Sequence, residues 1–169
     1  WLPAGSMKRD GQTLGWGMAG AAWIAARFAA AANVELRDDG TARVACGTQD
    51  IGTGTYTILA QLTSQRTGVS LEKVEVALGD TSPPEGPVSG GSMATASVVP
   101  AVFAAADSAI AALLTIATTT PGSPFEKRNP DELSFENGRV FVKTDSPAGG
   151  VPFADLLRGA NIRLVTGDG

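Results

Sequence analysis

Histidine is absent from this 169-residue sequence, and cysteine occurs once, at Cys46. Without histidine there is no Ser-His-Asp or Cys-His catalytic system, no histidine-ligated zinc or haem, and no imidazole switch near neutral pH. A single cysteine excludes intrachain disulfides, zinc knuckles and iron–sulfur ligation, and it leaves the redox compartment undetermined. The sequence therefore does not describe a self-contained metalloprotein of a common type.

Charged residues are scarce at 18%, and the basic ones do not cluster. The 13 Lys and Arg against 17 Asp and Glu give a net charge of -4 and a pI near 4.8. Because phosphate backbones are bound by clustered basic residues, nucleic acid is not expected as the main partner. The hydrophobic share of 43% predicts a folded chain of one ordinary domain or two small subdomains.

The longest apolar stretch, residues 98–117, approaches the length of a membrane span. Asp107 lies near its middle, where an aspartate costs about 2.5 to 3.5 kcal/mol on membrane insertion, and Pro100 lies near its start. We therefore expect a helix buried in protein. No signal peptide is apparent, and both ends of the sequence look cut from a longer chain.

Alternating and helical patterns place the first elements. Residues 33–36 and 42–45 alternate around a turn-forming Arg37-Asp38-Asp39-Gly40, which predicts a β-hairpin. Residues 16–32 are rich in alanine, and we expect them to extend the first strand as a small-residue strand in place of forming a helix. Apolar spacing then predicts a helix over residues 55–66.

A third strand is predicted over residues 74–78, which completes a β-β-α-β unit. After a long loop, apolar residues three and four apart predict a long helix over residues 97–117. Residues 133–136 and 139–143 flank Asn137-Gly138, a strong hairpin signal, and a short helix is predicted over residues 153–158.

Together these elements predict an α+β fold in which a mixed or antiparallel sheet packs on helices. We divide the sequence into an extended leading segment over residues 1–15 and a β-β-α-β-α unit over residues 16–117. A hairpin with a short helix over residues 118–169 then begins the next subdomain.

Gly15-Trp16-Gly17-Met18-Ala19-Gly20 matches the dinucleotide fingerprint, with Glu35 or Asp38 near the distance for a ribose contact. A true fingerprint follows a hydrophobic strand, whereas residues 8–14 are mostly polar. A Rossmann dehydrogenase is the less favoured alternative, and a strand over residues 16–28 would eliminate it.

Two further glycine loops, residues 47–54 and 88–95, each precede a predicted helix. The first lacks the Lys and Ser/Thr of a phosphate loop. A helix start nevertheless offers free N–H groups to an anion, and glycine admits a close ligand. Each loop alone is also explained as a helix cap with a glycine hinge. If both starts face the same side, they form a double anion cradle.

The loop carboxylates Asp50, Asp80 and Glu85 are not placed at a catalytic separation by anything in the sequence. We interpret each as a helix cap or a solvated turn residue. Cys46 ends a predicted strand without a basic neighbour, so we interpret it as a small buried hydrophobe.

Five blocks in order give the sequence a family resemblance. They are Gly15-Trp16-Gly17-Met18-Ala19, Asp39-Gly40-Thr41, residues 47–57, Gly79-Asp80-Thr81, and Gly90-Gly91-Ser92 with Ala101-Val102. In this combination the chain resembles the molybdopterin-binding large subunit of the xanthine dehydrogenase and aldehyde oxidase family, in its bacterial aldehyde oxidoreductase branch. The likeness runs from about residue 8 and corresponds to the first part of the second molybdopterin-binding domain, which includes the unit over residues 16–117.

The resemblance implies an oxidoreductase that holds molybdenum on molybdopterin, as the cytosine dinucleotide, and hydroxylates aldehydes or N-heterocycles with oxygen from water. It implies iron–sulfur clusters and FAD on partner subunits only, with the remainder of the large subunit as a further partner. Neither nucleic acid nor a membrane is implied as a partner. The compartment stays open between cytoplasm and periplasm.

The same resemblance implies cofactor contacts in the two loops. Thr53 stands where many relatives have a pterin-contacting Gln, and its hydroxyl can still donate. Gly91 and Ser92 fall where backbone amides approach the molybdenum ligands, with Thr95 within reach of the dinucleotide. The expected cofactor-binding residues are Gln49, Gly52, Thr53, Gly54, Gly91, Ser92 and Thr95.

No catalytic or metal-ligating residue is expected in this sequence. The family's general-base glutamate lies in a glycine-rich motif near the C-terminus, and no glutamate here lies in such a motif. We therefore expect the isolated chain not to turn over substrate. A non-catalytic binding or scaffold module that retained the fold is the alternative from another class.

Overall fold

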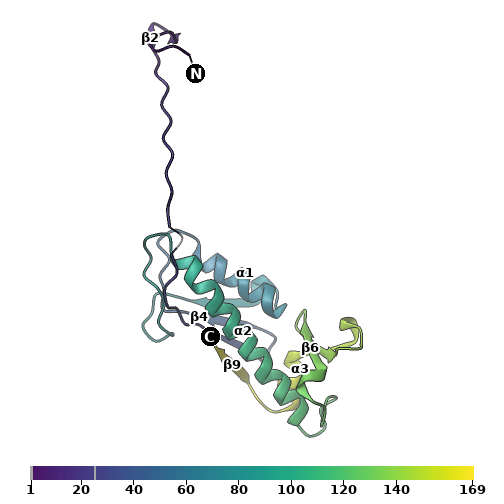
Figure 1. Ribbon diagram of the computed structural model, residues 1–169. Helices are drawn as coiled ribbons and strands as arrows, with labels where there is room; N and C mark the ends of the chain where they lie inside the picture. Colours follow the sequence, from purple (N-terminus) through teal and green to yellow (C-terminus); the bar gives the residue numbers. More distant parts are fainter. Residues whose placement is uncertain (1, 25) are drawn as a thin grey trace.

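The computed structural model describes residues 2–24 and 26–169. The outer part of the N-terminal arm, which precedes Asn33, stands away from the body of the molecule, and a hairpin of β1 (Lys8–Arg9) and β2 (Gln12–Thr13) lies at its tip (Figure 1). From residue 14 to residue 32, the described part of the arm contains neither helix nor strand.

The predicted strand over residues 16–32 is therefore wrong. The reason lies in the strands that pair with β3 (Asn33–Arg37). Asn33 already stands opposite the last residue of each neighbouring strand, Ala45 on one side and Asp168 on the other. Residues before Asn33 have no paired strand on either side, and their backbone hydrogen bonds are few. Ala32 exchanges two with Gly169, at 2.8 and 3.0 Å, and Ala31 N donates to Glu85 O at 2.8 Å.

The central sheet has four strands in the order β5-β4-β3-β9. β3 pairs antiparallel with β4 (Ala42–Ala45) and with β9 (Leu164–Asp168). β4 pairs in parallel with β5 (Val74–Ala77), and α1 (Thr55–Thr67) connects these two strands. The mixed sheet and the β-β-α-β unit are thus confirmed.

The β3–β4 turn follows from its sequence. Gly40 has a φ of 82°, which L-residues rarely adopt, and the Asp39 carboxylate accepts from Thr41 N at 2.9 Å. Along β3, Val34 and Leu36 are fully buried, while the residues between them face the other side of the sheet. One face of the sheet is therefore apolar and has to be buried against other elements.

Helices α1 and α2 (Ala94–Thr119) pack on this apolar face and lie side by side in Figure 1. α2 crosses β9 and β3 through a seam of small residues. A Cβ on Gly167 would lie 2.1 Å from Ala109 N and 2.2 Å from Ala105 O. Because only glycine permits this approach, the backbone of β9 packs directly on the helix.

By length and composition, α2 is the one helix among the described residues that could cross a membrane. It contacts β9, β3 and α1, and Ala105, Ala109 and Leu113 are fully buried. One side of the helix is therefore packed inside the protein, as predicted, whereas Ala104, Asp107 and Ser108 on the other side are exposed. The helix extends from Ala94 to Thr119, somewhat beyond the predicted bounds.

The face of the sheet opposite the helices carries a network of ion pairs. Arg37 and Arg43 each pair with both Glu35 and Glu75, at distances from 2.7 to 3.2 Å. The two arginines and the two glutamates therefore neutralise one another.

A second, three-stranded sheet contains β6 (Leu133–Glu136), β7 (Arg139–Val142) and β8 (Val151–Pro152), followed by α3 (Phe153–Gly159). The Asn137-Gly138 hairpin is confirmed, with φ of 51° and 71° at its two turn residues. The remaining short 3-10 turns are Leu71–Lys73, Pro130–Glu132 and Pro147–Gly149. One cluster of buried residues runs through both sheets.

Candidate functional site

The two glycine loops lie against each other and are joined by Gln49. Ser89 Oγ donates to Gln49 O at 2.8 Å, and Ser89 N donates to Gln49 Oε1 at 3.3 Å. Beneath them the fully buried Thr48 hydroxyl donates to Pro87 O at 2.9 Å. The loops therefore form one surface, in which Gln49 is a connecting residue.

A hollow of about 360 Å³ opens on this surface at the first turn of α2. Its polar lining comes from both loops and from the helix start, and it includes no carboxylate. The lining residues are Ile51, Thr53, Ser89, Gly90, Gly91, Ser92, Met93, Ala94 and Thr95.

Four of the seven residues expected to bind a cofactor meet in this hollow: Thr53, Gly91, Ser92 and Thr95. Gln49 lies outside the lining and holds the loops together. Gly52 and Gly54 also lie outside it, on either side of Thr53. The two loops therefore lie on one side of the molecule, with four of the expected residues in the hollow and three outside it.

The start of α1 is already occupied by the carboxylate of Asp50. Its Oδ1 accepts from Gly52 N at 2.8 Å, Thr53 N at 2.9 Å and Gly54 N at 3.3 Å, and its Oδ2 accepts from Tyr56 N at 3.3 Å. The interpretation of Asp50 as a cap is confirmed. The double anion cradle is wrong, because this internal anion fills one of its two helix starts.

These contacts change the acidity of Asp50. Desolvation pushes its pKa upward, but the N–H groups of Tyr56, Gly52, Gly54 and Thr53 outweigh that effect and hold the pKa below its ordinary value. The φ values of 94° at Gly52 and 83° at Gly54 bend the loop around the carboxylate. Gly52 and Gly54 therefore allow the loop to turn around the Asp50 carboxylate.

The start of α2 is different, because no side chain caps it among the described residues. Met93 occupies the cap position without a side-chain hydrogen bond, and Ser92 before it has a φ of 56°. Ser97 in the first turns is engaged internally, donating to Met93 O at 2.8 Å. The exposed helix start therefore adds its positive end to the hollow.

The N-terminal arm contributes a third element, which no pattern in the sequence indicated. Trp23 Nε1 donates to Gly91 O at 3.0 Å, and Phe28 N donates to Ser97 Oγ at 3.0 Å. Further along, Ala31 N donates to Glu85 O at 2.8 Å. The arm therefore passes along the second glycine loop and the start of α2.

The dinucleotide fingerprint at residues 15–20 has no structural support. No helix follows it in the described residues, as a Rossmann site requires. Gly15, Gly17 and Gly20 lie at ordinary φ values, and a Cβ on any of them would meet nothing within 4 Å. The Rossmann interpretation is therefore wrong, and no close backbone packing accounts for these glycines either.

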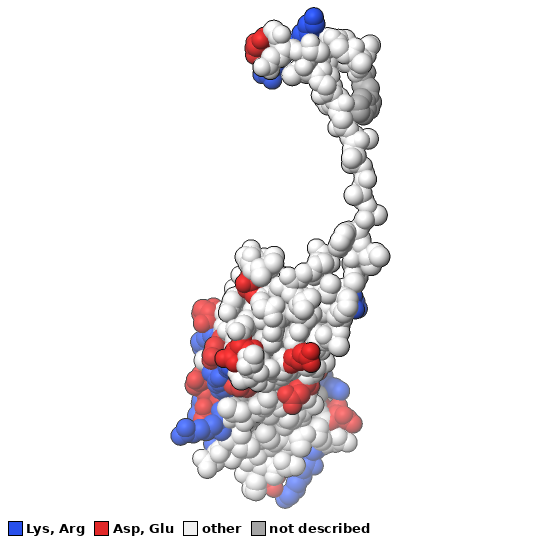
Figure 2. Space-filling view, turned by 90° about the vertical axis from the view of Figure 1, so that its left-hand side faces the viewer, with Lys and Arg blue, Asp and Glu red and all other residues white. Residues whose placement is uncertain are grey.

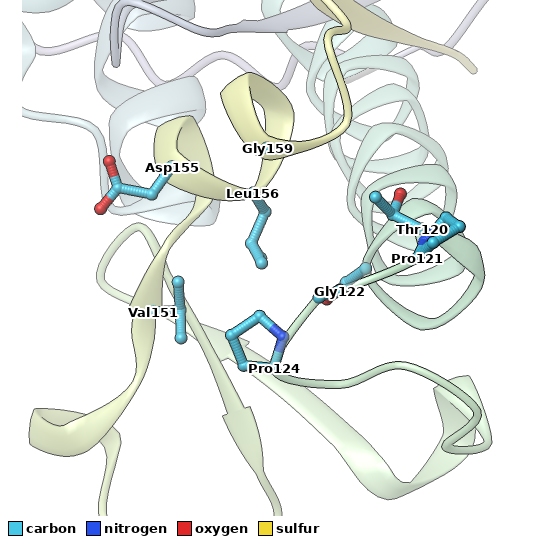
Figure 3. Close-up of a pocket in the computed structure, with 10 residues that line it drawn as sticks. Thr120, Pro121, Gly122, Pro124, Val151, Asp155, Leu156 and Gly159 are labelled. Atoms are coloured by element: carbon cyan, nitrogen blue, oxygen red, sulfur yellow. The ribbon is translucent and has the colours of Figure 1, made fainter.

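A smaller hollow of about 180 Å³ lies between the end of α2, β8 and α3 (Figure 3). Pro124, Val151 and Leu156 line it, and the carboxylate of Asp155 points away from them. Asp155 is paired with Arg158. Because no set of polar groups converges there, this hollow is the weaker candidate for a binding site.

The remaining reactive groups are structural. Burial raises the pKa of the Cys46 thiol, which is fully buried. Asp80 accepts from Ser82 N at 2.8 Å, and this backbone contact lowers its pKa. Within residues 2–24 and 26–169, no three His, Cys, Asp or Glu side chains come together to hold a metal ion.

Residues 4–167 match the family of the molybdopterin cofactor-binding domain, so the chain belongs to that family. The match covers nearly the whole sequence and includes the arm as well as both sheets. The family resemblance found in the sequence is thereby confirmed.

Two curated relatives are similar in sequence. The aldehyde oxidoreductase molybdenum-binding subunit PaoC of Escherichia coli K12 is 46% identical over 74 residues, which cover 44% of this chain and 10% of PaoC. A nicotinate dehydrogenase subunit from Pseudomonas putida KT2440 is 33% identical over 139 residues, covering 80% of this chain and 11% of that protein. The matched segments thus span about a tenth of the length of these relatives.

Two solved structures share the fold. CO dehydrogenase from Oligotropha carboxidovorans superposes with a TM-score of 0.69 at 19% identity, covering 83% of this chain and 18% of that one. Quinoline 2-oxidoreductase from Pseudomonas putida 86 gives a TM-score of 0.58 at 21% identity, covering 82% and 18%. At these identities the likeness establishes the fold.

Proposed function

We propose that this chain is part of the large subunit of a molybdenum hydroxylase and forms one wall of its molybdopterin site. The observation that carries the proposal is the hollow at the uncapped start of α2, in a chain that belongs to the molybdopterin cofactor-binding family. The proposed reaction is hydroxylation of an aldehyde or an N-heterocycle with oxygen from water.

The donor set of the hollow fits such a cofactor. Hydroxyls of Thr53, Ser92 and Thr95 line it together with the peptide groups around Gly90, whereas the Ser89 hydroxyl already donates to Gln49 O. Neutral donors suit a pterin ring, and the helix start favours a phosphate. No carboxylate lines the hollow to repel that phosphate. Bound molybdopterin supplies the redox chemistry, which no side chain of this sequence provides.

Each expected residue has a distinct proposed role. Thr53, Ser92 and Thr95 bind through hydroxyl groups, and Gly91 binds through its backbone. Gln49 keeps the two loops together. Gly52 and Gly54 position Thr53 by holding the loop around Asp50. In this proposal, Gln49, Gly52 and Gly54 do not touch the cofactor and instead hold the loops in the shape that binds it.

The finer features of the proposal concern the complete enzyme. Both curated relatives are subunits by name, which supports a role within a larger assembly. We propose the cytosine dinucleotide as the cofactor form, and iron–sulfur and FAD subunits of the xanthine dehydrogenase and aldehyde oxidase type as partners.

The test uses the full-length parent subunit, co-expressed with its partners, and measures bound molybdenum and released CMP. Gly90→Val is the informative variant, since Gly90 lines the hollow, has an ordinary φ and leaves open space around its Cβ. The side chain therefore fills the hollow without straining the backbone. We expect molybdenum and CMP in the wild type and a loss of both in Gly90→Val.

Gly149→Val is the matched control, because a Cβ there also meets nothing within 4 Å and Gly149 lies outside the hollow. It should load like the wild type. Equal circular dichroism and thermal unfolding would show that both variants fold. If the wild type carries neither molybdenum nor nucleotide, the scaffold alternative replaces this proposal.

A further inference from the structure

A second hollow of about 500 Å³ adjoins the first one across the start of α2. Ser92 and Thr95 line both hollows, so one continuous surface surrounds the first helical turn. The second hollow also contains Arg27 from the arm, and Val99, Pro100 and Phe103 from α2. Arg27 is the basic residue that lines this combined surface.

The arm is fixed to the body on both sides of Arg27. Before it in the chain, the Trp23 indole donates to Gly91 O at 3.0 Å, and after it Phe28 N donates to Ser97 Oγ at 3.0 Å. Ser97 is only 3% exposed and belongs to the first turns of α2. These two hydrogen bonds therefore hold the guanidinium-bearing residue beside the helix start.

The charges at this place are unbalanced. Among the ion pairs formed by the described residues, none involves Arg27, and neither hollow is lined by an Asp or Glu. In Figure 2 the charged residues of the arm gather at its tip, and the stretch between the tip and the body is white. A guanidinium thus lies beside the positive end of a 26-residue helix without an acidic partner in the hollows.

The Arg27 guanidinium and the start of α2 are both positive, and hydroxyl donors lie between them. This arrangement suits a phosphate. The helix start offers N–H groups, Ser92 and Thr95 offer hydroxyls, and a guanidinium offers paired donors to two phosphate oxygens. An anion in this position relieves the repulsion between the guanidinium and the helix end. Neutral donors alone, as in the first hollow, suit the pterin ring.

We propose that Arg27 binds a phosphate of the molybdopterin cofactor and that the arm therefore belongs to the cofactor site, together with the two glycine loops. The inference rests on the proposed function and adds a residue and an element to it. The phosphate is either the terminal phosphate of molybdopterin or the pyrophosphate of its dinucleotide form, and both present the same oxygens to a guanidinium.

The experiment uses the full-length parent subunit in its complex and measures the rate at which pterin is lost, followed by pterin fluorescence after gel filtration. Arg27→Gln removes the charge and keeps a side chain of similar reach. Loss of a charge-assisted contact should accelerate pterin dissociation about tenfold. Arg27→Lys, which keeps the charge, should restore most of the retention.

Arg163→Gln is the matched control, since Arg163 is exposed, lies just before β9 and lines neither hollow. It should lose pterin at the wild-type rate. Salt gives a second measurement: wild-type dissociation should accelerate with ionic strength, and that dependence should be weaker in Arg27→Gln. CMP released along with pterin assigns the contact to the dinucleotide, and pterin without CMP assigns it to the terminal phosphate.

Equal dissociation rates and equal salt dependence in wild type and Arg27→Gln would overturn the role of Arg27 and leave the proposed function standing. A wild-type subunit that never carries pterin would overturn both. If Arg27→Gln does not fold, salt-independent dissociation in the wild type alone is sufficient to reject the phosphate contact.

Discussion

Asp50 stabilises its glycine loop as an internal anion, and this is the residue-scale feature that separates the two helix starts. Its carboxylate accepts from four backbone N–H groups at the start of α1, whereas no side chain caps α2 within the described residues. The contrast explains why only one of two similar glycine loops borders an open helix start. A ligand at α1 would have to displace a carboxylate that is part of the chain.

Asp50→Asn should destabilise the loop and the fold, because the neutral amide accepts more weakly from these N–H groups and also loses the favourable contact with the helix end. The expected result is a lower urea midpoint for unfolding at neutral pH. An unchanged midpoint would show that the carboxylate contributes nothing through its charge.

The same residue predicts a pH dependence. The pKa of Asp50 is lowered in the folded state from its ordinary value of 3.8, so the folded state binds this proton less readily than the unfolded chain does. Its stabilisation is therefore complete well above pH 3.8 and is lost as the pH falls through 3.8 toward the folded pKa. The stability gap between wild type and Asp50→Asn should narrow over that acidic range in urea titrations.

Gly167 tests the packing of β9 on α2. A Cβ at this position would lie 2.1 Å from Ala109 N, a backbone atom that cannot move aside. Gly167→Ala should lower the free energy of unfolding by about 3 kcal/mol. Gly159→Ala, where a Cβ meets nothing within 4 Å, should leave it unchanged or slightly raised. Similar losses in the two variants would contradict the close approach.

At the scale of elements, α1 and α2 are linked by an ion pair between Arg66 and Asp107. Arg66 Nη2 donates to Asp107 Oδ2 at 2.8 Å, and the two side chains are 50% and 49% exposed. The aspartate that argued against a membrane span thus points toward the neighbouring helix.

Asp107→Ala should cost only about 0.5 kcal/mol of unfolding free energy, because an exposed pair gains little over hydration and salt screens it. The loss should shrink further at high ionic strength in denaturant titrations. A loss of several kcal/mol, insensitive to salt, would mean that the pair lies in a less solvated place than the structure shows.

The elements with clear local signals could be predicted from the sequence. The hairpin at Asn137-Gly138 and the long helix depend on turn chemistry and on a regular apolar period, which are local properties. β9 escaped prediction because Gly167 replaces an apolar side chain in its alternating pattern. Its role depends on α2, about 60 residues earlier in the chain, which no local pattern records.

The candidate site was only partly predictable for a related reason. Glycine loops before helices pointed to Thr53, Gly91, Ser92 and Thr95, which line one hollow. The sequence allowed Asp50 to be a helix cap but did not show that its carboxylate closes the start of α1 to a ligand, and it gave no sign that the arm lies along the start of α2. Both features depend on contacts between residues of irregular segments, and such segments have no periodic sequence pattern from which the contacts could be predicted.

At the scale of the whole molecule, the chain matches about a tenth of the length of its curated relatives, and its described residues supply a hollow without a catalytic carboxylate. We therefore predict that the purified 169-residue chain shows no aldehyde oxidation with an artificial electron acceptor, even with added cofactor. Turnover by this chain alone would contradict the assignment of catalysis to the rest of the large subunit.

The central claim is that the hollow beside the start of α2 holds molybdopterin. The most direct measurement is an experimental structure of the full-length subunit with its cofactor bound. The account predicts pterin density within hydrogen-bond distance of the backbone from Gly90 to Ser92, with a phosphate beside Arg27. Cofactor density elsewhere, with this hollow empty or filled by protein, would contradict it.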